Sequence, residues 1–422
     1  MTAACAAPAL VVPATPVAVR RLLLLAFVAA TSPLAVDLYL ASFPDIQRDL
    51  ATTPAMVQLT LTAYLVGIAI GQPIWGPLSD RFGRRVPLLV ANGVTVASSV
   101  AIALAPTIEW LVAGRFVQAL SAAAGMVIAR AMIADLADGY AGVRALSVMM
   151  SIHGITPVVG PLLGGVLASF LPWRGVLAVF AGMVTVQLVV SVLLVQETLP
   201  RTRRGTRLSY GDLGRVLRRP GFLAHGLTVG CAVASLMAYV AASSFVYQDV
   251  LGFSPLAFGV SFAVNAMGMA LGGLVSAQLA RRHVHPARTV AWALPAAVTS
   301  CLLVTLAAAS AWPLLLVVPV FANAVCANLV MANSMGLAME HARGLPGAGS
   351  AMLGLLMFGL SSLSTPLPGL IGGGSAVPMG VVMTGSTILA AVVFSSGRAW
   401  IARHPETEAS LVVARAASLV PH

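Results

Sequence analysis

Twelve apolar runs, each about 20 residues long, constrain this 422-residue chain more than any other feature of its sequence. A run of that length spans the hydrocarbon core of a bilayer as an α-helix. Six runs fall in the first half, at 22–43, 56–78, 87–106, 108–130, 142–170 and 175–195. Six more fall in the second half, at 221–247, 254–280, 287–309, 312–335, 347–370 and 376–396. The sequence therefore predicts an all-α membrane protein with twelve transmembrane helices.

The charged residues support this fold class and exclude other functions. Only 9% of the chain is charged, against about 25% in soluble domains. All 24 basic residues are arginine and the net charge is +11. Most of these arginines lie in short loops between apolar runs, so they indicate membrane orientation, and no nucleic acid partner is expected. Without lysine a Walker A motif is impossible, which excludes ATP-driven transport by this chain.

The runs are grouped as two sets of six, which indicates a duplicated architecture. We expect a cytoplasmic tail (1–21), a six-helix bundle (22–196), a basic cytoplasmic linker (197–220), a second six-helix bundle (221–396) and a cytoplasmic tail (397–422). The arginines are concentrated in the loops on one side, and the opposite loops hold only Arg48 and Arg174. By the positive-inside rule both termini are expected in the cytoplasm, with the helices in the cell inner membrane. No cleavable signal peptide is evident.

Two segments carry patterns that a plain apolar helix does not need. The first is the loop between the second and third spans, with Gly76, Asp80, Arg81, Gly83, Arg84 and Arg85. Its glycines permit close helix approach and a tight turn, and Asp80 can pair with an arginine or cap a helix. The second lies in the fifth span, with Gly154, Pro157, Gly160, Pro161, Gly164 and Gly165. Two prolines and four glycines would bend this helix and let neighbouring helices pack closely.

Two charged residues lie clearly within the membrane part of apolar runs, Asp37 in the first span and Arg115 in the fourth. A charge at membrane depth costs roughly 2.5–3.5 kcal/mol on insertion scales and usually marks a pathway or proton relay. Asp37 can exchange a proton, and Arg115 can bias such a carboxylate because it keeps its own proton. We take both as candidates for proton coupling or substrate binding. Tyr39, Tyr64 and Gln118 are candidates for the lining of a substrate cavity.

These segments resemble those of a known family. The loop is similar to the G-x-L-x-D-R-x-G-R-R signature of the major facilitator superfamily, which gates movement between the two halves. The fifth span resembles the G-x-x-x-G-P-x-x-G-G element of its drug:proton antiporters. The segment from Asp37 to Pro44 resembles the D-x-Y-L-P-x-x-P stretch of the Bcr/CflA (bicyclomycin/chloramphenicol resistance) subfamily, with Ala41 where a proline is usual. Arg115 matches the arginine of the family's R-x-x-Q-G-x-x-A element, in which Ala119 replaces the glycine.

The resemblance implies the major facilitator fold and proton-coupled efflux of small drug-like molecules by alternating access. It also implies a monomer whose partners are the substrate, protons and the lipid bilayer. An alternative is a proton-coupled exporter or importer of a sugar, amino acid or purine on the same fold. A membrane-embedded enzyme is not expected, because only two residues are clearly charged within the membrane, and the short tails leave no room for a receptor's signalling domain. Cys5, Cys231, Cys301 and Cys326 match no metal or disulfide pattern, so no metal or cofactor is expected.

Overall fold

The computed structural model describes residues 19–136, 139–200, 202, 204–205, 210–310, 312–372 and 374–404. Most of both predicted tails and the linker arginines Arg201, Arg203 and Arg207 lie outside these residues. The described chain forms twelve long helices: α1 (Val19–Asp37), α3 (Pro54–Phe82), α4 (Arg85–Ala103), α5 (Ile108–Leu136), α6 (Gly139–Ala168), α7 (Trp173–Leu194), α9 (Pro220–Phe245), α10 (Pro255–Arg281), α11 (Pro286–Ala309), α12 (Val317–His341), α13 (Pro346–Ser364) and α15 (Val377–Arg403).

Length and composition let these helices cross a membrane. Eleven described segments are long and apolar enough to do so, and Gly154–Ala168 is a shorter apolar stretch within the 30-residue helix α6. Exposed leucines, valines and isoleucines lie along the outward faces of the helices, where lipid rather than water suits them. The predicted fold class, twelve transmembrane helices, is confirmed.

Proline and hydroxyl residues set several helix starts. Pro54 opens α3, where its missing N–H breaks no helical hydrogen bond, and the Thr53 side chain accepts a hydrogen bond from the Met56 backbone N–H at 3.4 Å. Ser254 caps α10 in the same way, accepting from the Ala257 N–H at 3.2 Å. These caps define where the chain leaves each loop and enters the next span.

The predicted first span is broken in the structure. The expected run was 22–43, but α1 ends at Asp37, a 3-10 turn follows (η1, Leu40–Ser42), and a short helix α2 (Phe43–Asp49) completes the segment. Trp173 holds α2 in place, donating from its backbone N–H to Asp45 at 3.1 Å and from its ring N–H to Asp49 at 2.9 Å. The break therefore leaves Asp37 at the end of α1.

Other short elements were not predicted. An eight-residue helix, α8 (Tyr210–Leu217), lies within the predicted basic linker. The eleventh span divides into α13 and α14 (Leu367–Ile371), with Pro366 and Pro368 at the junction. A single π-helical turn (η3, Val246–Val250) extends α9. Pro366 and Pro368 explain the break between α13 and α14, because a proline has no backbone N–H to continue the helical hydrogen bonds.

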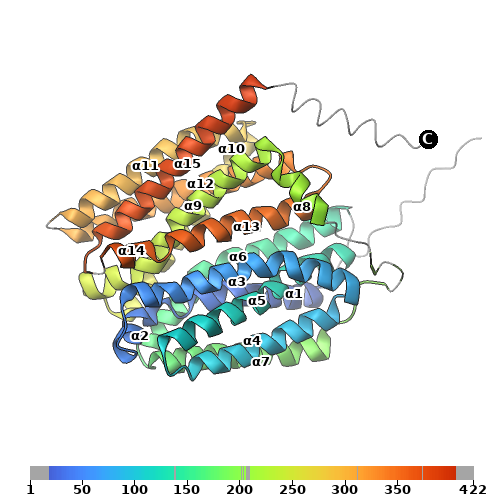
Figure 1. Cartoon of the computed structure of the whole chain (residues 1–422), viewed down its shortest axis with the longest axis horizontal. Helices are drawn as coiled ribbons and strands as arrows, with labels where there is room; N and C mark the ends of the chain where they lie inside the picture. The colour runs from blue at the N-terminus through green and yellow to red at the C-terminus, as the bar shows by residue number, and fades with distance from the viewer. Residues whose placement is uncertain are drawn as a thin grey trace, which may run out of the picture.

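The twelve helices form two halves with the same internal packing (Figure 1). Helices α1, α3, α4, α5, α6 and α7 occupy the lower part of the view, and α9 to α13 with α15 the upper part. In the first half α3 packs on α5, α4 on α7, and α1 on α6; in the second half α10 packs on α12, α11 on α15, and α9 on α13. Each pair in one half thus has its counterpart in the other.

The halves meet through two helix pairs that the repeat also relates. α6 packs on α10, and α3 packs on α13, so the fifth helix of each half contacts the second helix of the other. We call the end of the bundle that carries α8 and the loop between α3 and α4 the linker end, and the end that carries α2 and α14 the far end (right and left in Figure 1). The candidate site lies between these two ends.

Candidate functional site

Arg115 is the centre of a buried cluster in the first half. Its side chain is fully buried on α5. One guanidinium nitrogen donates to Gln118 Oε1 at 2.5 Å and the other to the Ala35 carbonyl at 2.8 Å. The guanidinium carbon lies 4.0 Å from the ring centroid of Tyr39 and 4.4 Å from that of Tyr64. Two acceptors and two aromatic faces thus surround the buried cation, which offsets much of its desolvation.

A second layer of hydrogen bonds fixes this cluster. Tyr39 shares a hydrogen bond with Thr60 at 2.8 Å, Tyr64 donates to the Ser32 carbonyl at 2.8 Å, and Gln118 donates to Ser99 at 2.7 Å. Helices α1, α3, α4 and α5 all contribute to the cluster. Four residues that the sequence analysis selected, Arg115, Tyr39, Tyr64 and Gln118, therefore lie together, although the last three pack against Arg115 and line neither of the two cavities described below.

Asp37 lies near Tyr64 of this cluster but is not bonded to it. It is 8% exposed, and its carboxylate has no ion pair or hydrogen bond with any residue in the described part of the chain, Arg115 included. The sequence analysis placed Asp37 and Arg115 in one coupling site; the structure places them on adjacent helices without an ion pair. Since no partner holds the carboxyl group, Asp37 can gain or lose a proton without breaking a salt bridge.

The glycines of α6 bring Asp37 against this helix. A Cβ atom at Gly160 would lie 2.6 Å from the Asp37 Cβ, and one at Gly164 would collide with the Leu38 carbonyl. Glycine is therefore required at both positions for α1 and α6 to approach so closely. Gly154 has no described atom within 4 Å of its missing side chain, so it takes no part in this contact.

A neighbouring face of the same α6 segment contacts the other half. A Cβ atom at Gly165 would lie 2.5 Å from the Pro255 carbonyl, and one at Gly259 would lie 2.6 Å from the Pro161 carbonyl. A Cβ atom at either glycine would also lie 3.2–3.3 Å from the α carbon of the other, so the two helix backbones approach closely here. The sequence analysis missed Gly259 and Pro255, which carry no signature without a partner helix. The glycine-proline segment thus joins Asp37 on one face to α10 on the other.

The halves are closed together at the far end. Gln58 of α3 accepts a hydrogen bond from the Gly369 N–H at 2.9 Å and donates to the Ala241 carbonyl at 3.4 Å. Gln248 donates to the Ala41 carbonyl at 2.9 Å. These bonds cross from one half to the other, and two phenylalanine rings, those of Phe43 and Phe245, pack between them with centroids 5.9 Å apart.

At the linker end the halves are separated by a cavity of about 240 Å³. It is lined by α3, α5, α8 and α13, through Gln72, Pro73, Gly76, Pro77, Ser79, Asp80, Arg84, Val127, Arg130, Ala131, Leu213, Gly347, Ser350 and Ala351. The halves are thus in contact at the far end and separated by a cavity at the linker end. The space between them therefore faces the linker end.

The loop between α3 and α4 forms a charged cluster beside this cavity. Arg84 donates to Asp80 at 2.5 Å, to Asp135 of α5 at 2.9 Å and to Ser79 at 2.8 Å. Burial lowers the pKa of Arg84, but the ion pairs with Asp135 and Asp80 outweigh it and raise the pKa above its ordinary value. Arg81, by contrast, is exposed, with its guanidinium 5.4 Å from the Phe82 ring.

Glu197, which follows α7, holds the start of α4. Its carboxylate accepts hydrogen bonds from the backbone N–H groups of Arg84 at 2.9 Å and Arg85 at 3.3 Å. Burial raises the pKa of Glu197, but the backbone N–H bonds from Leu199, Arg84 and Arg85 outweigh burial and lower it. Gly83 has φ +90° and packs against this carboxylate, so the turn needs a residue without a side chain. Arg85 donates to the Val192 carbonyl at 2.9 Å.

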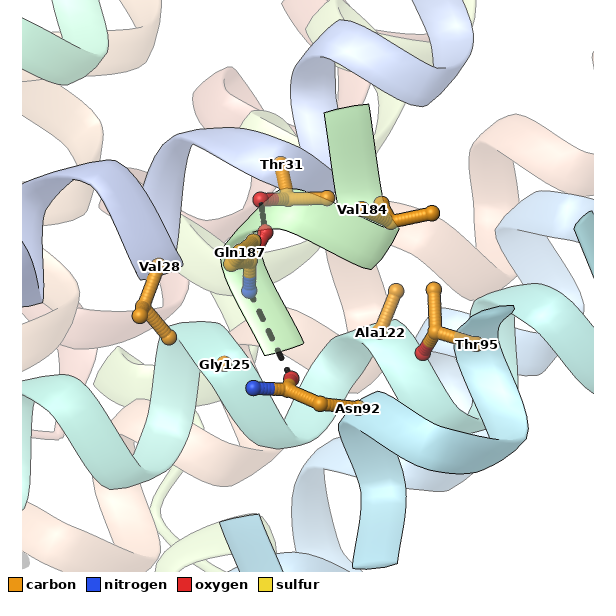
Figure 2. Close-up of a pocket in the computed structure, with 8 residues that line it drawn as sticks. All are labelled: Val28, Thr31, Asn92, Thr95, Ala122, Gly125, Val184 and Gln187. Carbon is orange, nitrogen blue, oxygen red and sulfur yellow. Dashed lines mark hydrogen bonds between the residues drawn. The ribbon is translucent and has the colours of Figure 1, made fainter. Parts of the chain in front are cut away.

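Each half also contains a buried polar cluster that sequence reasoning did not find. In the first half Thr31, Asn92 and Gln187 surround a cavity of about 10 Å³ (Figure 2). Thr31 donates to Gln187, whose amide nitrogen lies 3.5 Å from Asn92 Oδ1. The corresponding helices of the second half bring together Ser235, Cys301, Asn323 and Thr387, with 2.9 Å between the Thr387 and Ser235 hydroxyls and 3.2 Å between Cys301 Sγ and Asn323 Oδ1.

The described residues contain no group of three or more histidine, cysteine or acidic side chains that could hold a metal ion. The arrangement as a whole offers a contact between two halves, a buried carboxyl group beside that contact and a cavity at one end. Those are the parts of a carrier for small molecules.

Comparison with known proteins agrees with this geometry. Residues 25–366 match the family model of the Major Facilitator Superfamily. The chain belongs to that superfamily. It is 35% identical, over 88% of its length and 93% of the relative's, to an uncharacterized MFS-type transporter, YdgK, of Bacillus subtilis. Its relatives are transporters rather than enzymes.

Two further relatives are named for antibiotic resistance. A bicyclomycin resistance protein homolog of Haemophilus influenzae is 26% identical over 88% of this chain and 94% of its own length. A chloramphenicol resistance protein of Pseudomonas aeruginosa is 33% identical over 56% of each chain. The resemblance to drug-efflux members of the superfamily that the sequence analysis described is thereby confirmed.

Solved structures show the same fold. A bacterial homolog of the human lysosomal transporter Spinster, in an inward-facing conformation, has a TM-score of 0.69 at 16% identity, covering 90% of this chain and 97% of that one. A variant of the nucleoside transporter NupG has a TM-score of 0.70 at 12% identity, covering 90% and 99%. At these identities the likeness concerns the fold alone. With its membrane-spanning helices and bacterial relatives, the chain is a multi-pass membrane transporter.

Proposed function

We propose that this transporter exports small drug-like molecules, such as chloramphenicol- or bicyclomycin-type antibiotics, in exchange for protons. The α6 segment carries the proposal, because Gly160 touches Asp37 on one face while Gly165 touches α10 of the other half on a neighbouring face. A change of protonation at Asp37 therefore occurs one helix away from the seam that must move in alternating access. The names of the resistance-protein relatives support the substrate class.

The proposed cycle uses the two ends of the bundle in turn. Substrate enters the cavity at the linker end while the Gln58 and Gln248 bonds keep the far end closed. Movement of the halves along α6–α10 and α3–α13 then closes the linker end and opens the far end, where a proton on Asp37 replaces the substrate. The proton gradient drives the return; one charge moved through 100 mV is worth roughly 2.3 kcal/mol.

We also propose the membrane orientation and boundaries expected from the sequence. The far end carries Arg48 and Arg174, whereas the linker end carries the arginines of the α3–α4 loop, the linker and the second half. That distribution favours a cytoplasmic linker end with both termini inside. The bundles at 22–196 and 221–396, a monomeric state and the roles of Tyr39, Tyr64 and Gln118 in substrate contact belong to the same proposal.

The test is antibiotic susceptibility of an efflux-deficient bacterium expressing the wild type, Asp37→Asn or Asp249→Asn. Asp249 is an exposed carboxylate at the far end and serves as the matched control. We expect wild type and Asp249→Asn to raise resistance to chloramphenicol or bicyclomycin, and Asp37→Asn or an uncoupler to abolish it with the protein still in the membrane. Full resistance from Asp37→Asn would refute the role of Asp37, and no resistance from the wild type would favour metabolite transport.

A further inference from the structure

Arg130 is a charged residue of the linker-end cavity that the proposed cycle does not use. It lies on α5, six residues before that helix ends at Leu136, and its partly buried side chain lines the cavity. It makes no hydrogen bond or ion pair with any residue that the structure describes. An ionisable side chain inside a membrane bundle usually has a functional partner, and for Arg130 the described residues supply none.

The other two charged groups on the cavity wall are already engaged. Arg84 bonds to Asp80, and Asp135 behind the wall pairs with Arg84 as well. Asp80 therefore already accepts a hydrogen bond from a cation other than Arg130. Among the charged side chains that line the cavity, Arg130 alone makes no hydrogen bond or ion pair with a described residue, so all its guanidinium donors are available to a bound group.

The start of α13 faces the same cavity and, like Arg130, favours a negatively charged group there. Gly347 and Ser350 of its first turn line the wall. The residue before this helix, Leu345, provides no side-chain cap. The first N–H groups of a helix carry partial positive charge. The start of α13, in the second half, therefore attracts a negative group together with Arg130, which belongs to the first half. A group bound here would touch both halves.

The size and lining of the cavity limit what this group can be. About 240 Å³ is below the 300–1,000 Å³ of pockets that enclose whole drug-sized ligands. The remaining wall is largely apolar, with Pro77, Val127 and Leu213. Such a site accommodates an oxygen-rich group at one end of a molecule while the apolar body follows. A guanidinium fork matches the two oxygens of a carboxylate or nitro group.

We propose that Arg130 binds the carboxylate or nitro group of a transported compound at the linker end, so that the exporter accepts anionic and neutral compounds and discriminates against lipophilic cations. This proposal rests on the proposed function in one respect: it takes the cavity to lie on the path of the substrate. A cation entering the cavity would meet Arg130 and the positive end of α13, whereas the Asp80 carboxylate is already bonded to Arg84.

The test measures binding to the purified protein, with no proton gradient. The probes are nalidixate, an aromatic carboxylate, and tetraphenylphosphonium, a lipophilic cation. We expect the wild type to bind nalidixate more tightly. Arg130→Gln should weaken nalidixate binding about tenfold or more, since a charge-assisted hydrogen bond contributes roughly 1.5–3 kcal/mol and 1.4 kcal/mol is tenfold. Its affinity for tetraphenylphosphonium should be unchanged or higher.

Two further variants keep the test decisive. Arg282→Gln removes an exposed arginine at the linker end outside the cavity and should alter neither affinity. Ser350→Asp places a carboxylate opposite Arg130 and should weaken nalidixate binding as Arg130→Gln does, which decides the matter if Arg130→Gln does not fold. Equal nalidixate affinities in wild type, Arg130→Gln and Ser350→Asp would overturn the proposal, as would tighter wild-type binding of the cation or no binding of nalidixate.

The outcome is separable from that of the export test. Binding that depends on Arg130, in cells that gain no resistance, would support the site and refute the proposed export. Proton-driven resistance together with binding that ignores Arg130 would leave the proposed function in place and refute the site.

Discussion

Substitution of Gly160 by alanine tests whether close contact between α1 and α6 positions Asp37. The added Cβ would lie 2.6 Å from the Asp37 Cβ, about 0.8 Å inside the 3.4 Å limit of ordinary contact. Its other neighbours, Asp37 Oδ2 and Leu34 Cδ1, are both at 3.5 Å and tolerate it. The conflict is therefore confined to the backbone-proximal atom of Asp37, which cannot rotate away, so α1 and α6 must separate.

The magnitude follows from two opposing effects. Overpacking of a buried contact costs about 1–3 kcal/mol, whereas replacing glycine by alanine in a helix stabilises it by about 1 kcal/mol. The net destabilisation is thus about 0–2 kcal/mol, which leaves the protein folded. Displacement of Asp37 from α6, rather than unfolding, should then abolish proton-driven export.

The assay combines thermal unfolding of the purified variant with drug resistance in the efflux-deficient strain. Gly182→Ala is the matched control, because Gly182 also lies within a helix and no described atom is within 4 Å of its missing side chain. Gly154→Ala should behave like that control for the same reason. If Gly160→Ala matched Gly182→Ala in both stability and resistance, the contact would have no role in coupling.

Two further predictions address the two ends of the bundle. Gln58→Leu removes the bonds from Gln58 to Gly369 and Ala241 and should shift the protein toward opening at the far end, seen as longer distances between spin labels there; unchanged distances would contradict the assigned closure. Glu197 has a lowered pKa in the folded protein, so its contribution to stability is complete above its ordinary pKa of about 4.3 and is lost as the pH falls through the lowered value. The protection factors of the Arg84 and Arg85 amides against hydrogen exchange should therefore fall only in strong acid, whereas Glu197→Gln should lower them at neutral pH; equal protection in variant and wild type would argue against this cap.

The helices could be predicted because lipid leaves the backbone few choices. A run of apolar residues in a membrane must satisfy its own hydrogen bonds, so the twelve runs sufficed to locate the spans. The breaks were harder to predict. Asp37 ends α1 within an uninterrupted apolar run, and the reason lies in α2, whose Asp45 and Asp49 bond to Trp173, a residue more than a hundred positions away.

The candidate site also has parts that the sequence could predict and parts that it could not. Burial within an apolar span singled out Arg115, and the residues around it gathered there because a buried cation needs acceptors and aromatic faces. The absence of an ion pair between Asp37 and Arg115 could not be read from their presence in adjacent spans, since it depends on where each lies along its helix. The position of Arg130 could not be predicted from the sequence either, because only the structure shows that it faces a cavity shared by both halves.

The internal repeat supports the proposal that one short segment couples protonation to movement. The repeat relates the α6–α10 seam to the α3–α13 seam, but the two seams differ in their chemistry. The first has closely approaching backbones at Gly165 and Gly259 and resembles a hinge, whereas the second carries the Gln58 bond at one end and the cavity at the other. Because Asp37 adjoins the tight seam rather than the open one, a small change at the carboxyl group acts where the halves remain in contact. The opposite seam, with its cavity, is then the side on which opening and closing occur.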